Sequence, residues 1–240
     1  MNQPIELQRD YWDAWNASNR EHHQSEVSRD QRAMVLGWLA DLNRTDLDII
    51  EVGCGAGWLC PSLKPFGRVT ATDLSTQVLN RANQRIPDVR FIAGDFMALD
   101  IAPAFFDVAV TLEVLSHVSD HQAFIEKLNR VLRPGGLLML ATQNRPVLER
   151  FNDVAETQPG QLRRWFDKYE LRALLDPQFE LLRLETITPV ASKGPLRLLA
   201  GRKAKQLIRA VVGRSVERVL AGAGLGWTLM ALARKRETAR

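Results

Sequence analysis

Residues 51–60 read EVGCGAGWLC and hold three glycines within five positions, directly after an apolar run. Glycine allows backbone conformations and close approaches that side chains forbid, so this stretch predicts a tight loop that brings the backbone near a ligand. The run 47–53 before it is typical of a buried strand, and 57–67 after it is typical of a short helix. Such a turn from the first strand to the first helix of a doubly wound sheet is where nucleotide-like ligands bind.

Strand-like and helix-like segments alternate beyond this loop. Further strands are predicted at 68–73, 88–95, 105–114, 137–144, 179–190 and 226–236, and helices at 75–86, 119–136 and 168–176. This alternation predicts an α/β fold with a doubly wound, mostly parallel, seven-stranded Rossmann-like sheet. A helical stretch at 5–42 precedes the sheet as an N-terminal cap, and an amphipathic, basic stretch at 195–222 is expected as helices inserted between the last two strands.

The chain shows no linker, repeat or low-complexity segment. Its 240 residues fit one large domain. We expect a single domain over 1–240, with a helical cap at 1–44, a cofactor-binding core at 45–145 and a substrate-side, C-terminal part at 146–240.

Composition excludes several classes of protein. A hydrophobic content of 45% and a charged content of 25% are ordinary for a globular domain. No signal peptide is recognisable and no apolar run reaches the ~18 residues of a membrane span, so a cytoplasmic protein is expected. Cys54 and Cys60 are too few for a zinc site, so we expect no metal and regard both cysteines as incidental.

Positive charge gathers near the C-terminus. Residues 194–240 hold 11 Lys and Arg against 2 Asp and Glu, giving +9, whereas the whole chain carries +4. The favoured interpretation of the basic segment 194–220 is a solvated helix face. The alternatives are a peripheral membrane protein, with weak lipid contact through this segment, and an RNA-binding protein; nucleic acid is the less favoured partner.

The spacing of the glycines separates two classes of ligand. A dinucleotide-binding loop reads G-x-G-x-x-G, and Gly53 and Gly55 fit its first two positions. The sixth position is Trp58, and the third glycine is Gly57 instead. A tryptophan at the helix start obstructs a pyrophosphate that seeks helix N–H groups. An NAD-dependent oxidoreductase is therefore a disfavoured alternative.

Acidic residues close to three strand ends narrow the choice. Glu51 precedes the glycines, and Asp73 ends the second predicted strand, where a carboxylate can accept both hydroxyls of a ribose. Asp95 ends the third strand and, with apolar Phe96 and Leu74, suits an adenine ring. Acids without a basic residue among them fit a phosphate-free, positively charged adenosyl ligand. S-adenosylmethionine is such a ligand.

At this point the sequence resembles the class I S-adenosylmethionine-dependent methyltransferases. The resemblance covers roughly residues 45 to 145 and rests on five ordered motifs: EVGCGAG, ATDLS, AGDFMAL, FDVAVTLEVLSHV and VLRPGGLLMLATQN. The stretches LEVLSHV and TQNR resemble the branch that includes ubiquinone-biosynthesis O-methyltransferases. The resemblance implies an enzyme that transfers a methyl group to an oxygen or nitrogen atom of a small-molecule acceptor. It also implies that the methionine part lies against Gly53, Gly55 and Gly57, the ribose against Asp73, the adenine against Asp95 and Phe96, and the methionyl amine beside Leu112 and Glu113.

A general base is needed only where the acceptor is a hydroxyl or a carbon acid. His117 lies just beyond the fourth predicted strand and is the first candidate, because its ordinary pKa suits a base near neutrality. The alternative is that this histidine only hydrogen-bonds its loop. Glu113 is the second candidate, and a contact with the methionyl amine is its favoured role.

Two further groups are expected around the ligand. Tyr11, Trp12 and Trp15 belong to the aromatic stretch YWDAWN at 11–16 and are expected to cover the cofactor, with cation–π contact to the sulfonium. The alternative is a hydrophobic face that docks the helix. Asn144 and Arg145 follow the fifth strand and are expected to border the acceptor pocket. The oligomeric state stays open.

Overall fold

The computed structural model describes residues 4–19 and 25–237. Seven strands form one sheet in the order β3-β2-β1-β4-β5-β7-β6. Their bounds are β1 (Leu47–Val52), β2 (Gly67–Asp73), β3 (Arg90–Ala93), β4 (Phe106–Leu112), β5 (Leu132–Gln143), β6 (Phe179–Ile187) and β7 (Thr228–Lys235). The first five strands run parallel, and β7 runs antiparallel to both β5 and β6. The predicted doubly wound, mostly parallel sheet is confirmed.

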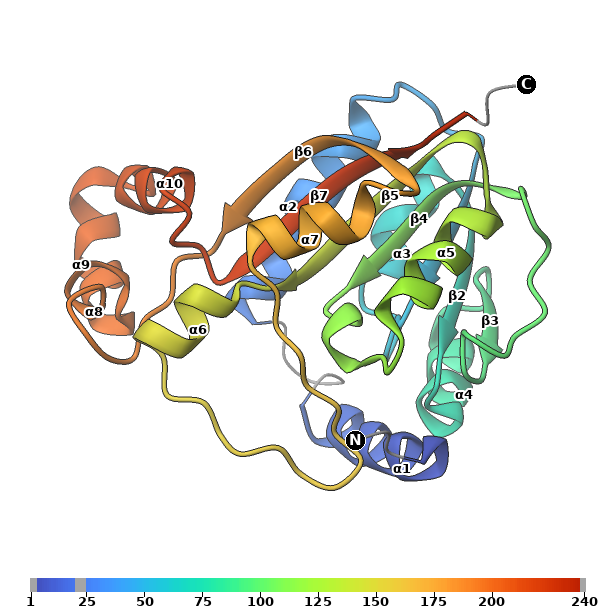
Figure 1. The fold of residues 1–240 in the computed structure, drawn as a ribbon, viewed down its shortest axis with the longest axis horizontal. Coiled ribbons are helices and arrows are strands. Elements are labelled where there is room, and N and C mark those ends of the chain that lie inside the picture. The colour runs from blue at the N-terminus through green and yellow to red at the C-terminus, as the bar shows by residue number, and fades with distance from the viewer. Residues whose placement is uncertain (1–3, 20–24, 238–240) are drawn as a thin grey trace.

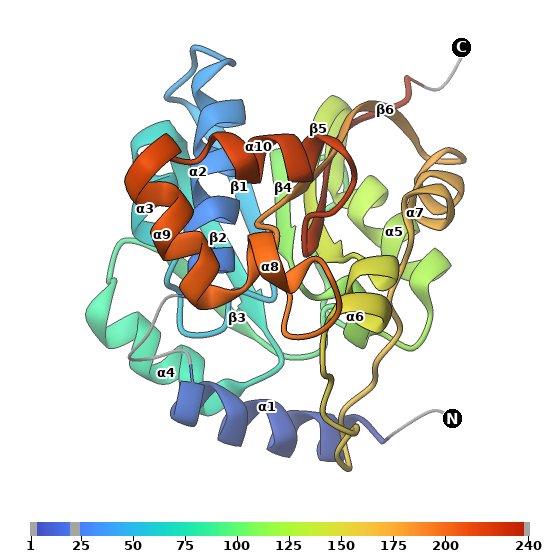
Figure 2. The same ribbon diagram turned by 90° about the vertical axis from the view of Figure 1, so that its left-hand side faces the viewer.

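Helices cover both faces of this sheet (Figures 1 and 2). They are α1 (Ile5–Asn19), α2 (Glu26–Ala40), α3 (Cys60–Leu63), α4 (Thr76–Arg85), α5 (His121–Val131), α6 (Arg145–Phe151), α7 (Lys168–Leu175), α8 (Arg197–Ala200), α9 (Arg202–Val212) and α10 (Ser215–Gly222). Two short 3₁₀ helices, η1 (Lys64–Phe66) and η2 (Leu115–His117), complete the described elements. The expected insertion between the last two strands is present as α8, α9 and α10.

Each face of the sheet has its own hydrophobic core. Ile50 of β1 packs in the same cluster as Phe124 and Leu128 of α5, whereas the neighbouring Ile49 packs with Trp38 and Leu39 of α2. All six residues of β1 are buried. Successive side chains of a strand point to opposite faces, so this central parallel strand needs apolar residues on both.

Several predicted boundaries differ from the structure by a few residues, and two predicted helices differ by more. The helical stretch predicted over 5–42 is two helices, α1 and α2, and residues 20–24 between them lie outside the described part of the chain. The helix predicted over 119–136 ends at Val131, and β5 already begins at Leu132. Pro134 has no backbone N–H and cannot continue a helix, so the chain leaves α5 before it reaches this residue.

The insertion lies at one end of the molecule, beyond β6 and β7 (Figure 1). In Figure 2 it faces the viewer, and α1 crosses the lower side of the molecule beneath the strands. Within residues 4–19 and 25–237, no helix combines the length and the apolar character needed to span a bilayer.

Candidate active site

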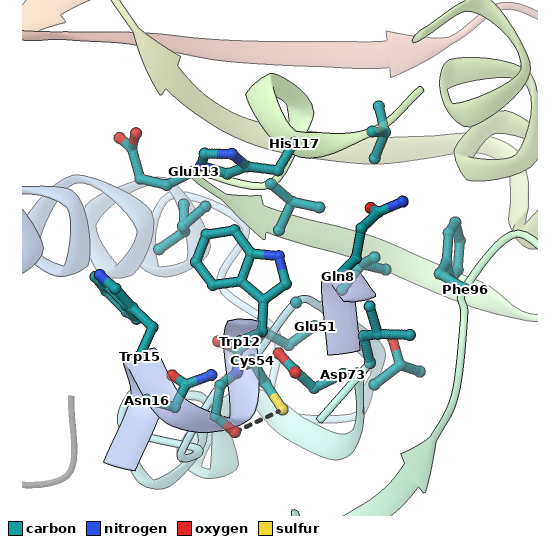
Figure 3. A pocket seen from close by; sticks show the side chains of 18 of the residues that line it. Gln8, Trp12, Trp15, Asn16, Glu51, Cys54, Asp73, Phe96, Glu113 and His117 are labelled. Atoms are coloured by element: carbon teal, nitrogen blue, oxygen red, sulfur yellow. Dashed lines mark hydrogen bonds between the residues drawn. The ribbon is translucent and has the colours of Figure 1, made fainter. Parts of the chain in front are cut away.

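A cavity of about 530 Å³ lies at the carboxyl ends of β1, β2 and β4, with α1 along one side (Figure 3). Four carboxylates line it: Glu51, Asp73, Asp95 and Glu113. Among the described residues, no lysine or arginine does so. A volume of this size is typical of a small-molecule site. Its charge favours a positively charged ligand over a phosphate.

The glycine loop follows β1 and is bonded to β2. The N–H groups of Gly53 and Cys54 both donate to the carbonyl oxygen of Thr72, at 2.8 and 3.0 Å. Gly53 has a φ of +75°, and a Cβ there would lie 2.1 Å from Cγ2 of Val114. Only glycine fits this position without a shift. Gly53 and Gly55 line the cavity, but Gly57 packs beneath the loop, where a Cβ would lie 3.2 Å from Phe91.

Asp73 joins ligand recognition to the shape of this loop. Its Oδ2 accepts a hydrogen bond from the Gly55 N–H at 2.7 Å, and its Oδ1 accepts one from the Ser75 N–H at 2.9 Å. Burial raises the pKa of Asp73, although these two bonds oppose the rise. The carboxylate is therefore fixed in direction, and its remaining lone pairs face the cavity where two ribose hydroxyls could donate.

Glu51 is almost fully buried at the end of β1, with 2% of its surface exposed. Burial raises the pKa of this carboxyl well above its ordinary value. The Cys60 thiol donates to Glu51 Oε2 at 3.1 Å, and Cys54 lines the cavity. The expectation that both cysteines are incidental is wrong, because one orients a site carboxylate and the other forms part of the wall.

Glu113 follows β4 with a φ of +66°, which is rare for a residue other than glycine. Its Oε1 accepts hydrogen bonds from Gln31 of α2 and from the Thr228 hydroxyl of β7, the latter at 3.3 Å. Strained backbone of this kind gathers at functional sites. The carboxylate is held by donors from two elements, so its geometry favours anchoring a ligand over accepting a proton.

His117 ends η2 and lines the cavity beside Glu113 (Figure 3). Its Nδ1 lies 2.6 Å from the Leu162 carbonyl oxygen, and since a carbonyl only accepts, Nδ1–H donates. Nε2 is then the nitrogen with a free lone pair. Burial lowers the pKa of His117, and the Trp12 ring meets the imidazole edge-on at 4.7 Å. The site thus holds a neutral imidazole in a defined tautomer.

The predicted adenine residues lie together at the ends of β2 and β3. Asp95 Oδ1 accepts a hydrogen bond from the Met97 N–H at 2.9 Å. The Phe96 ring packs edge-on against Phe124 at 5.7 Å, and both Phe96 and Leu74 line the cavity. A carboxylate can accept a hydrogen bond from the amino group of an adenine, and the apolar side chains beside it can pack against the ring.

The N-terminal helix presents two of its three predicted aromatic residues to the cavity. Trp12 and Trp15 line it, but Tyr11 does not; the Tyr11 ring packs edge-on against Trp12 at 4.9 Å. A helix cannot turn every residue of an aromatic stretch to one side. The lining residues of this helix beyond Ile5 follow helical spacing: Gln8, Trp12, Trp15 and Asn16. Helical spacing in the sequence could therefore have identified Gln8 and Asn16 as lining residues.

Neither predicted acceptor residue reaches the cavity. The Asn144 side chain donates to the carbonyl oxygens of Gly224 and Gly226 at 3.0 and 2.8 Å. Arg145 forms ion pairs with two acidic residues near the start of α7. Gln143 and Trp227 line the cavity in their place. Because strand side chains alternate in direction, an error of one residue moves a prediction to the wrong side.

Sequence comparison agrees with this geometry. Residues 50–140 match the family model described as a methyltransferase domain. Residues 50–140 thus carry a methyltransferase domain, in agreement with the predicted resemblance to the class I S-adenosylmethionine-dependent methyltransferases. The predicted cofactor agrees with this family, and an NAD-dependent enzyme is not favoured. Within the described ranges, no group of three His, Cys, Asp or Glu side chains is placed to hold a metal ion.

Curated relatives extend the match. The ubiquinone biosynthesis O-methyltransferase of Colwellia psychrerythraea is 35% identical over 109 residues, which are 42% of this chain and 44% of that protein. Its namesake from Brucella anthropi is 31% identical over 159 residues, 64% of this chain and 61% of that protein. The matches thus span about half of these relatives' length, and they confirm the resemblance to the ubiquinone branch.

A solved structure supports the fold over nearly the whole chain. The 1,6-didemethyltoxoflavin-N1-methyltransferase of Burkholderia thailandensis, crystallised with 1,6-didemethyltoxoflavin and S-adenosylhomocysteine, superposes with a TM-score of 0.66. The two sequences are 21% identical, and the alignment covers 99% of this chain and 92% of that one.

Proposed function

We propose that this protein transfers the methyl group of S-adenosylmethionine to an oxygen or nitrogen atom of a small-molecule acceptor. The observation that carries the proposal is the lining of the cavity, with four carboxylates and, among the described residues, neither lysine nor arginine. Buried carboxylates without cations favour a cationic ligand, because its charge replaces the missing counter-ions. A sulfonium with an α-amino group and no phosphate meets this requirement.

The residues of the cavity fit the parts of this cofactor. Asp73 would hold the ribose, Asp95 and Phe96 the adenine, and the backbone of Gly53 and Gly55 the methionine part. Bound S-adenosylmethionine supplies a methyl group that its sulfonium activates for displacement, so the protein must chiefly align the acceptor and exclude water.

Trp12 and Trp15 contribute to that exclusion of water. They line the cavity along α1 and present two large apolar surfaces to it (Figure 3). Water at the reacting centre would compete with the acceptor and weaken the attraction between the carboxylates and a cation. We therefore assign α1 the role of closing the site, in addition to any cation–π contact of its tryptophans.

His117 favours a hydroxyl acceptor over an amine. Its Nε2 can take the proton of a hydroxyl as the oxygen attacks the methyl group, while the Leu162 carbonyl holds the opposite nitrogen. The imidazole starts neutral because burial lowers its pKa. Gln143 and Trp227 offer a polar and an aromatic surface on the acceptor side of the same cavity.

Two measurements test this proposal. Titration calorimetry should show binding of S-adenosylhomocysteine and none of NAD. A labelled-methyl screen across phenols, amines and carboxylates should give its strongest product with a hydroxyl-bearing acceptor. Tight NAD binding without binding of S-adenosylhomocysteine would refute the proposal.

The role of His117 has its own test. His117→Ala should lower kcat for a hydroxyl acceptor by about 10²–10⁴, with S-adenosylhomocysteine affinity nearly unchanged. His121→Ala is the matched control, since His121 lies close in sequence but does not line the cavity. Turnover that survives in His117→Ala means that His117 is not the base.

A further inference from the structure

Helix α9 turns two of its four basic residues inward and exposes its apolar stripe. Lys205 and Arg209 face the body of the protein, and the Lys205 residue is only 5% exposed. Leu207 and Val211 are 72% and 79% exposed. A surface helix of a globular protein normally buries its apolar stripe and solvates its charged one. The interpretation of this segment as a solvated basic face describes only part of α9, since Arg202 and Lys203 are exposed beside aliphatic residues whereas Lys205 and Arg209 face inward.

A network of ion pairs holds α9 and α10 in this orientation. Lys205 Nζ lies 2.9 Å from Glu26 Oε2 and donates to the Pro189 carbonyl oxygen at 3.0 Å. Arg209 pairs with Glu26 and, at 2.6 Å, with Oε2 of Glu217. Arg214 pairs with Asp30 at 2.6 Å. Three cations thus meet three carboxylates beside a small apolar cluster that includes Leu196, Ala200 and Leu220. The inward side of the insertion is therefore held by paired charge as well as by apolar burial.

The outward side carries an unusual number of aliphatic residues. Among the described residues, eleven large apolar side chains are exposed. Six of them belong to the insertion: Leu198, Leu199, Leu207, Val211, Val212 and Val219. Such a concentration marks an interaction surface, whereas scattered exposed apolar residues need no explanation.

Unpaired positive charge accompanies this apolar surface. Of the residues that the structure describes, five exposed basic ones without a carboxylate partner lie in the insertion or in the segment that leads from β6 to it: Lys193, Arg197, Arg202, Lys203 and Arg218. Within the part of the chain that the structure describes, no ion pair joins any of them to a carboxylate. The single acid between residues 192 and 225 is Glu217, which the inward network already uses. The exposed surface of the insertion is therefore apolar and positive at once.

We propose that α8, α9 and α10 form a docking surface for an anionic lipid bilayer. All six exposed apolar residues are Leu or Val, whereas energetically dominant residues of protein interfaces are chiefly Trp, Tyr and Arg, with Leu and Val under-represented. Helices that lie in the bilayer interface combine an apolar face with lysine and arginine, and these residues attract anionic headgroups. The attachment is peripheral: the aliphatic side chains enter the interface and the basic ones contact headgroups.

Helix α2 places this surface next to the cavity wall. Glu26 and Asp30 of its first turns bind the insertion, whereas Ser25, Val27 and Gln31 on the other side line the cavity. Docking of the insertion would thus bring the bilayer close to the wall of the cavity that α2 forms. The docking itself does not depend on the proposed reaction, and its test needs no turnover.

Vesicle flotation of the full chain tests the proposal. The protein should float with phosphatidylcholine vesicles that contain phosphatidylglycerol, and much less with phosphatidylcholine alone. High salt should weaken the binding, because headgroup attraction is screened. Each exposed basic residue removed should lower the partition coefficient by about fivefold.

Matched variants separate the surface from general effects. Leu207→Ser/Val211→Ser should lower the partition coefficient by at least about tenfold, and its thermal unfolding should match that of the parent protein. Tyr169→Ser is the apolar control, since Tyr169 is 70% exposed on α7. Arg202→Gln/Lys203→Gln should weaken binding to anionic vesicles, whereas Arg90→Gln/Arg172→Gln, with equal charge loss elsewhere, should not.

Three results would overturn the proposal. The first is a parent protein that does not bind anionic vesicles at low salt. The second is equal loss of binding in the control variants. The third is a parent dimer that Leu207→Ser/Val211→Ser dissociates while vesicle binding is absent, because the surface would then belong to a second copy of the chain.

Discussion

Two groups of buried carboxylates differ in what surrounds them. In the cavity, burial raises the pKa of Glu51 and of Asp73, and among the described residues no lysine or arginine lines that space. At the base of the insertion, burial also acts to raise the pKa of Asp30 and of Glu217. Hydrogen bonds, chiefly from Arg214 to Asp30 and from Arg209 to Glu217, and the charges of the surrounding cations together outweigh it, so both pKa values end below their ordinary range.

The presence or absence of paired cations indicates the role of each group of carboxylates. Where cations balance the carboxylates, the cluster is a structural joint between α2 and the insertion. Where they do not, ionised carboxylates are held at a cost in stability that an arriving cation offsets. Charge balance, more than residue type, separates the joint from the binding site.

The largest effect is expected from breaking the joint. Lys205→Met removes a buried cation and leaves Glu26 with Arg209 alone, so the free energy of unfolding should fall by about 3 kcal/mol. Urea unfolding measures this. Lys203→Met on the same helix removes an exposed charge and should change the unfolding free energy by less than about 0.5 kcal/mol. Equal stability of both variants would show that the joint contributes nothing.

The next effect concerns the unbalanced group. In Asp73→Asn, an amide NH₂ replaces one oxygen and cannot accept from the Gly55 or Ser75 N–H or from a ribose hydroxyl. The affinity for S-adenosylhomocysteine should fall about 100-fold, which is about 2.7 kcal/mol. Calorimetry measures it. Asp30→Asn, at the joint, should leave this affinity unchanged and reduce stability instead; the reverse pattern would invalidate the comparison.

The smallest effect is a pH dependence whose sign differs between the two regions. Acids with raised pKa contribute stability that is present below the unfolded pKa and is lost as the pH rises through the folded pKa. Acids with lowered pKa contribute stability that is present above the unfolded pKa and is lost as the pH falls through the folded one. Glu51 and Asp73 therefore ionise above their ordinary range of about 4 to 4.5, and Asp30 and Glu217 below it.

The pH dependence of ligand affinity tests whether the cavity acids ionise as expected. S-adenosylmethionine carries the sulfonium charge that S-adenosylhomocysteine lacks, so its relative affinity should increase as the cavity acids ionise. From pH 5 to pH 8 the affinity ratio should rise by up to about tenfold, and Glu51→Gln should flatten the rise. A ratio that is independent of pH would show that these carboxylates do not sense the ligand charge.

Much of the fold and half of the site follow from local patterns. The strands, the glycine loop and the acids at strand ends are each determined within a few neighbouring residues, so Asp73 and Glu51 could be placed by their distance from Gly53. Asn144 was predicted instead of Gln143 because strand direction changes with every residue. Tyr11 was predicted instead of Gln8 and Asn16 because the prediction followed the aromatic content of the stretch. The position of each residue around the helix determines which side chains face the cavity.

The orientation of α9 is a different kind of failure. Its sequence shows two stripes, one charged and one apolar, but a helix with two stripes can bury either of them. The choice depends on Glu26 and Asp30, which lie more than 170 residues away from their partners. Local periodicity contains no information about partners at that distance.

One consequence follows from the double use of Asp73, which binds both Gly55 and Ser75 and also faces the cavity. In evolution, a substitution there changes the loop and the recognition of the ribose in the same step, so no intermediate retains one while altering the other. Gln143 and Trp227 come from separate elements and can change one at a time. Descendants of this protein should therefore diverge in the acceptors they use long before they change the cofactor.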